Sequence, residues 1–125
     1  MKTSNFKSYK GSDGIAICLY PPLNWKGDVY MELAPSKSTF FEKKANKIDE
    51  AEYEKRFYDE TLSKLNPQEI YNKFKDKVLL CWEPSGEFCH RRIVSQWIFD
   101  NLGIEVPEWK SEDVIKPVEK ANSLF

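Results

Sequence analysis

The sequence has few cysteines and few glycines, and it has no long run of apolar residues. Its 125 residues include five glycines and three cysteines, Cys18, Cys81 and Cys89. An odd, sparse cysteine count argues against a disulfide scaffold, which normally carries dense, even-numbered cysteines. The opening residues contain no apolar stretch long enough for a signal peptide or a membrane span. We therefore expect a soluble, cytoplasmic protein without a membrane partner.

A strong excess of one charge is also missing. Lys and Arg total 19 against 20 Asp and Glu, which gives a formal net charge of -1. No overall field then attracts nucleic acid, and basic residues alternate with acidic ones along the chain. We predict no nucleic-acid partner, and any bound anion must be held by local geometry.

Two phosphate-binding motifs and the usual zinc spacings are absent as well. No G-x-x-x-x-G-K-[ST] segment occurs, which excludes a P-loop NTPase. No cysteine is followed six positions later by arginine, as it is in cysteine phosphatases. Metal-ligand residue types occur at Cys81, Glu83, Cys89 and His90, but their spacing matches no compact zinc pattern. Adjacent Cys89 and His90 are also expected to project in different directions, so we predict no metal site and no cofactor.

What the chain does have is the pattern of one small α/β domain. Hydrophobic residues make up 41% of it and aromatic residues 14%. Apolar runs predict buried strands, and apolar residues at helical spacing predict helices. The expected strands are 14–20, 77–82 and a short 104–106, and the expected helices are 49–65, 67–74 and 88–102. This alternation predicts a mainly parallel sheet flanked by helices, with a C-terminal extension.

Two segments do not fit that alternation. Residues 21–36 are interrupted by four Pro or Gly residues and predict an irregular loop, of the kind that often carries function. In the extension, Ser111 is expected to cap a short helix. The terminal Leu124 and Phe125 are expected to dock on the domain or on a second subunit, so a homo-oligomer is a further expectation.

The segment from Val78 to Leu102 is the predicted functional centre. In open α/β sheets, ligands bind beyond the carboxyl ends of strands, where loops meet helix N-termini. The helix that begins near Cys89 offers unpaired N–H groups, and Arg91 in its first turn adds a bidentate cation. Structural roles are equally open: Arg91 as an ion-pair partner of Glu83, His90 as a core histidine, and Cys89 as a small packing residue.

The same segment resembles a known signature. The run Val78-Leu79-Leu80-Cys81-Trp82-Glu83-Pro84, followed by Phe88-Cys89-His90-Arg91, is similar to that of the domain-of-unknown-function 488 (DUF488) family. Its usual form is an apolar strand ending in Leu-Leu-Cys-Tyr-Glu, a short loop, and Cys-His-Arg opening a helix, so Trp82 replaces the commoner tyrosine. The resemblance covers residues 3–106. It implies an α/β domain over 1–106, an extension over 107–125 outside the match, and no established general activity.

These features lead to one functional hypothesis. We expect the chain to bind a phosphorylated small molecule such as a nucleotide or nucleotide-derived signal, and a domain of this size could sequester such a ligand rather than convert it. Arg91 and the helix N–H groups would hold phosphate, and Glu83 would orient Arg91. Six further residues would supply polar, cationic or aromatic contacts: Cys81, Ser4, Asn5, Trp25, Lys26 and Tyr30.

Two alternatives stay open. The chain could be a hydrolase or transferase acting on a nucleoside or phosphate ester. Cys89 or Glu83 would then be nucleophile or base, with His90 as proton carrier and Arg91 as the stabiliser of developing negative charge. The second alternative is a protein-interaction module that uses residues 107–125.

Overall fold

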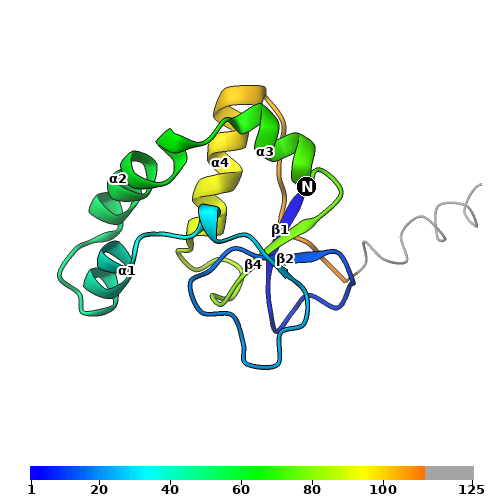
Figure 1. Cartoon of the computed structure of the whole chain (residues 1–125), viewed down its shortest axis with the longest axis horizontal. Helices are drawn as coiled ribbons and strands as arrows, with labels where there is room; N and C mark the ends of the chain where they lie inside the picture. The colour runs from blue at the N-terminus through cyan, green and yellow to red at the C-terminus, as the bar shows by residue number, and fades with distance from the viewer. Residues whose placement is uncertain (112–125) are drawn as a thin grey trace, which may run out of the picture.

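A computed structural model describes residues 1–111, and four parallel strands form the sheet of this part of the chain (Figure 1). The strands are β1 (Lys2–Asn5), β2 (Gly14–Ala16), β3 (Asp28–Val29) and β4 (Val78–Cys81), in the order β1-β4-β2-β3. Every pairing between neighbours is parallel. The central β4 is buried along its whole length, which explains its uninterrupted apolar sequence. The predicted α/β class with a parallel sheet is confirmed.

Four α-helices and two 3-10 turns complete the described residues. They are α1 (Lys37–Lys44), α2 (Glu50–Glu60), α3 (Pro67–Phe74) and α4 (His90–Leu102), with η1 (Met31–Leu33) and η2 (Leu62–Lys64). Local signals define several ends. Asp49 accepts a hydrogen bond from the Glu52 amide at the start of α2, and Asn66 does the same for Glu69 before α3. Gly103 ends α4 in the left-handed conformation, at φ 69°.

The sequence does not predict α1. Its aromatic residues Phe40 and Phe41 are adjacent rather than spaced along one face, so no apolar stripe marks the helix. Its start depends on Ser36, whose side chain accepts a hydrogen bond from the Thr39 amide. In Figure 1, α1 and α2 lie together, to one side of the sheet.

Three predicted elements differ in length or kind. The strand expected over 14–20 stops at Ala16; the Ile17 amide still donates to the Leu80 carbonyl, and the chain then bends at residues 18–20. The helix expected over 49–65 ends at Glu60, where Thr61 donates its hydroxyl hydrogen to the Ala34 carbonyl and η2 follows. Residues 104–106 form no strand. The Val106 carbonyl instead accepts hydrogen bonds from the side chains of Arg92 and Ser95.

The chain after α4 returns along the outer edge of the sheet. The Thr3 amide donates to the Pro107 carbonyl at 3.0 Å, and the Trp109 amide donates to the Thr3 carbonyl at 2.7 Å. The described fold therefore continues through Trp109. No helix of the described residues is long and apolar enough to cross a membrane. The expected helix after Ser111 and the docking of Leu124 and Phe125 lie outside the described residues.

Candidate functional site

A cavity of about 590 Å³ opens at the carboxyl ends of β2 and β4. Its walls come from the segment after β2, from α1 and α2, and from the loop that joins β4 to α4. Parallel sheets place ligands beyond the carboxyl ends of their strands, and the volume suits a small molecule. Four residues singled out from the sequence line this cavity: Cys81, Glu83, Cys89 and His90.

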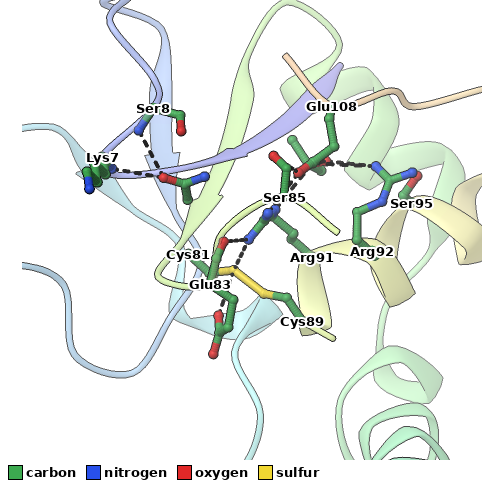
Figure 2. A network of polar contacts seen from close by, with 12 residues as sticks. Lys7, Ser8, Cys81, Glu83, Ser85, Cys89, Arg91, Arg92, Ser95 and Glu108 are labelled. Carbon is green, nitrogen blue, oxygen red and sulfur yellow. Dashed lines mark hydrogen bonds and ion pairs between the residues drawn. A yellow bond between two sulfur atoms is a disulfide. The ribbon is translucent and has the colours of Figure 1, made fainter. Parts of the chain in front are cut away.

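The two cysteines of this set are joined in a disulfide (Figure 2). The bond links the last residue of β4 to the residue that precedes α4, and it encloses the loop between them. The sparse, odd cysteine count predicts no disulfide scaffold, and a single bridge beside a cavity is not such a scaffold. In the bonded form neither sulfur is a thiolate, so a nucleophilic Cys89 requires the reduced pair.

His90 is buried with its ring fixed by the backbone. Its Nε2 lies 2.6 Å from the Ile17 carbonyl oxygen, which can only accept, so Nε2 carries the hydrogen. Burial is the main cause that lowers the pKa of His90, to about 4; Arg91 acts in the same direction and the Ile17 carbonyl opposes it. The neutral ring therefore presents the lone pair of Nδ1, which lies 3.9 Å from Cys89 Sγ.

Arg91 is fully buried and every nitrogen of its guanidinium has a protein partner (Figure 2). Nε and Nη2 donate to the two carboxylate oxygens of Glu108, at 3.2 and 2.7 Å. Nη1 donates to the Glu83 carbonyl at 2.8 Å and to Cys81 Sγ at 2.9 Å. The partner expected from the sequence was the Glu83 carboxylate. The structure instead uses the backbone of Glu83 and the carboxylate of Glu108.

Glu108 is the residue of this network that the sequence analysis missed. Burial raises the pKa of its carboxyl, but hydrogen bonds from Arg91 and Thr3 outweigh burial, and the net pKa lies below its ordinary value. Ser85 also donates to it at 3.0 Å, and Arg92 Nη1 lies 3.7 Å away. Glu108 lies beyond the residues that resemble the family. The one feature that could have pointed to Glu108 is the need of a buried arginine for a carboxylate partner.

Ser4 and Asn5 lie at the carboxyl end of β1, next to β4. Ser4 is buried, and its hydroxyl has no hydrogen-bond partner among the described residues. The Asn5 side-chain oxygen accepts from the amides of Lys7 and Ser8 and closes the turn after β1. Neither residue lines the cavity.

The three residues predicted in the 21–36 loop do not line the cavity either. The Trp25 indole donates to the Asp28 carbonyl and packs edge-on against Phe6. The Tyr30 ring packs against Phe74, and Lys26 is exposed. None of Trp25, Lys26 and Tyr30 therefore lines the cavity, although Trp25 packs against the buried cluster of Ala16, Cys18, Cys81 and Cys89.

The cationic and aromatic side chains that line the cavity come from other segments than this loop. Lys43 and Lys44 of α1 line the cavity, with their ammonium groups 5.7 Å from the Phe88 ring and 5.3 Å from the Phe40 ring. Tyr53 of α2 and Trp82 add further aromatic surface. The position of the two lysines beside the cavity could not be predicted from the sequence, because α1 itself carries no apolar stripe.

The family of the chain is shown by a match to a protein-family model. The model of the active DUF488-N3 subclade, DUF488-N3a, matches residues 10–102. The chain belongs to the DUF488 family. The match contains every residue that lines the cavity, whereas Glu108 lies outside it. No curated protein and no solved structure matches the chain. The expected cytoplasmic location and the expected partners stay predictions.

Proposed function

We propose that the cavity of this DUF488 chain binds a phosphorylated small molecule of the nucleotide class. The observation that carries the proposal is the polarity of the cavity. Lys43 and Lys44 lie on the α1 side, whereas Glu83 and Glu87 lie on the loop between β4 and α4. A nucleotide carries anionic phosphate together with hydrogen-bond donors on its sugar or base, and so matches both sides.

The phosphate end is assigned to α1 and to the start of α4. Cys89, the residue before α4, makes no side-chain cap hydrogen bond, and the Arg92 amide donates to the Cys89 carbonyl, so the donors assigned to a ligand are the amides of His90 and Arg91. The helix dipole and the two lysines favour the same negative charge. Glu50 also lines the cavity, so the local field is mixed, and a ligand with phosphate alone would meet three carboxylates: Glu50, Glu83 and Glu87.

The base end is assigned to Trp82. Its side chain is 54% exposed although it is large and apolar, and its indole nitrogen is fixed to the Tyr20 carbonyl at 2.7 Å. An exposed ring in a fixed orientation is suited to stacking on a flat heterocycle. Glu83 and Glu87 are placed to accept hydrogen bonds from hydroxyl or amino groups of the same ligand.

Arg91 has a different role here from the one expected from the sequence. Its guanidinium is already bonded to Glu108, Glu83 and Cys81, and it is not among the groups that line the cavity. A direct phosphate contact would require breaking its ion pair. In the proposed function Arg91 positions the loop and the first turn of α4.

A catalytic role on the bound ligand is the second candidate. The matching subclade is described as active, and Glu83, Cys89 and His90 all line the cavity. Hydrolysis or group transfer on a nucleoside or phosphate ester would use Glu83 for proton transfer. The reduced form would add Cys89 as a nucleophile, with the lone pair of His90 Nδ1 beside it.

Thermal-shift screening against mono-, di- and cyclic nucleotides and ADP-ribose derivatives tests the proposal. A ligand at one hundred times its dissociation constant should stabilise the fold by about 2.7 kcal/mol. The Lys43→Ala/Lys44→Ala double variant should lose the shift. Lys47→Ala, an exposed lysine just after α1 that does not line the cavity, should keep it.

Two outcomes distinguish binding from catalysis, and a third rejects the assignment to nucleotides. A ligand recovered intact after incubation supports binding alone, whereas conversion that stops in Glu83→Gln supports catalysis. If no compound of the panel stabilises the folded wild-type chain, the assignment to nucleotides is wrong.

A further inference from the structure

We propose that the reduced chain holds one thiophilic divalent cation, of the Zn²⁺ class, between Cys81 Sγ, Cys89 Sγ and His90 Nδ1. These three ligand atoms all lie within 4.8 Å of one another. The residues line the cavity and are otherwise buried, so a bound ion would sit at the cavity floor. The inference does not depend on the identity of the ligand proposed above.

The side chains of Cys89 and His90 lie close together, so the prediction that they project in different directions is wrong. Cys89 precedes the helix with an extended backbone, at φ -156° and ψ 144°, whereas His90 is the first helical residue. The change of backbone direction between them turns both side chains to one side, and Cys89 Sγ lies 3.9 Å from His90 Nδ1. Alternation or helical spacing alone would separate neighbouring side chains.

The orientation of His90 favours metal binding. The Ile17 carbonyl, 2.6 Å from Nε2, holds the hydrogen on that nitrogen and leaves the lone pair of Nδ1 directed to the sulfur side. Histidine ligands in metal sites commonly donate their other ring N–H to a backbone carbonyl in this way. The ring therefore needs no rearrangement to become a ligand.

The two sulfurs become ligands when the disulfide is reduced. A dithiol or phosphine reductant supplies two electrons, two protons are taken up, and two thiols result. The cation then replaces both thiol protons, which leave to solvent. The sulfurs must separate to about 3.8 Å, the distance set by two Zn–S bonds of about 2.3 Å at a tetrahedral angle.

The surrounding charges suit a buried dithiolate with a dication. Arg91 Nη1 lies 2.9 Å from Cys81 Sγ and is neutralised on its other side by Glu108. Two thiolates balance the cation, and Arg91 balances Glu108, so the buried groups sum to zero charge. A pair of buried thiolates without the cation would lack this balance.

The number of ligands points to a reactive rather than a purely structural ion. Three protein ligands leave a fourth position, and the cavity lies on that side. Glu83 Oε2 is 3.3 Å from Cys81 Sγ, close enough to accept a proton from a water bound at that position. As a metal ligand, the Cys89 sulfur would not be a nucleophile, so the two roles exclude one another.

Metal titration of the same chain before and after reduction is the first test. We expect the oxidised chain to bind no Zn²⁺ and the chain reduced with a phosphine to bind one equivalent. Bound Co²⁺ should show intense sulfur-to-metal charge-transfer bands that Zn²⁺ abolishes. No binding by the folded, reduced chain would overturn the inference, and so would equal binding by the oxidised chain, because thiolates would then not be ligands.

Variants identify the ligands. Cys81→Ser, Cys89→Ser and His90→Gln should each weaken Zn²⁺ binding by about 100-fold or more, whereas Cys18→Ser is the matched control. Cys18 is a buried, free cysteine that lines the same cavity but lies outside the three-ligand set. A loss of binding in Cys18→Ser equal to that in Cys89→Ser would refute the ligand set. If a ligand variant does not fold, the comparison of oxidised and reduced wild type still decides.

The nucleotide proposal can fail separately. The Lys43→Ala/Lys44→Ala variant should lose nucleotide and keep one equivalent of Zn²⁺. A wild-type chain that binds Zn²⁺ and no nucleotide would retain the metal site and remove the proposed function. The reverse result would remove the metal site alone.

Discussion

Arg91 and Glu108 form a two-point ion pair, in which Nε lies 3.2 Å from Oε2 and Nη2 lies 2.7 Å from Oε1. The pair joins the first turn of α4 to the segment that returns along β1. Arg91 is 0% exposed, and within residues 1–111 its charge is balanced by the Glu108 carboxylate. The pair therefore holds the start of α4, where Cys89 and His90 line the cavity, to the segment beside β1, and Figure 2 shows the two side chains next to one another.

Removing Glu108 should be strongly destabilising. Glu108→Ala leaves the buried guanidinium without its counter-charge, which costs about 3–5 kcal/mol in comparable buried pairs. Urea unfolding followed by circular dichroism measures the change. Glu105→Ala is the matched control, because Glu105 lies on the same segment and is exposed. A loss below about 1 kcal/mol for Glu108→Ala would show that the ion pair does not hold the fold.

Acid should weaken the fold through the same carboxyl. The pKa of Glu108 in the folded chain lies below its ordinary value of 4.5, because hydrogen bonds from Arg91 and Thr3 outweigh burial. The unfolded chain thus binds the proton more tightly, and the stabilisation is fully present above pH 4.5 and lost as pH falls through the lowered pKa. The difference in unfolding free energy between wild type and Glu108→Gln should shrink from pH 7 to about pH 3. A constant difference would contradict this.

The predictable parts of the molecule are those with local causes. Asn66 followed by Pro67 starts α3, Gly103 ends α4, and the apolar run of β4 marks a central strand. The cysteines and the histidine beside the cavity follow from a strand end that meets a helix start.

The contacts that could not be predicted from the sequence depend on tertiary packing. Lys43 and Lys44 reach the cavity only because α1 packs on α2, and Glu108 reaches Arg91 only because the chain returns along β1. No spacing within the sequence shows either contact. Cys89 and His90 are neighbours in the sequence, but the directions of their side chains depend on the change of backbone conformation at the start of α4.

The end of the fold can be tested by truncation. A chain that stops after residue 106 loses the backbone hydrogen bonds between Thr3 and residues 107 and 109, together with the Glu108 carboxylate. We expect it to lose about 3 kcal/mol or more relative to a chain that stops after Ser111. Equal unfolding midpoints in urea for the two chains would contradict this. A test of partner binding by the C-terminal residues should therefore begin its deletion at residue 112.

Ser4 provides a test of the opposite sign. Ser4 is 1% exposed and its buried hydroxyl has no partner among the described residues, so the folded chain has lost the hydration of this hydroxyl without a hydrogen bond in return. Ser4→Ala should leave the free energy of unfolding unchanged or raise it by about 1 kcal/mol. The neighbour Thr3 is the control, because its hydroxyl donates to Glu108 and accepts from Arg92 at 2.8 Å. Thr3→Val should lose about 1–3 kcal/mol. Nucleotide binding should survive Ser4→Ala, because Ser4 does not line the cavity. A variant that kept its stability but lost the ligand would instead place the hydroxyl of Ser4 in the binding site, as the sequence had suggested.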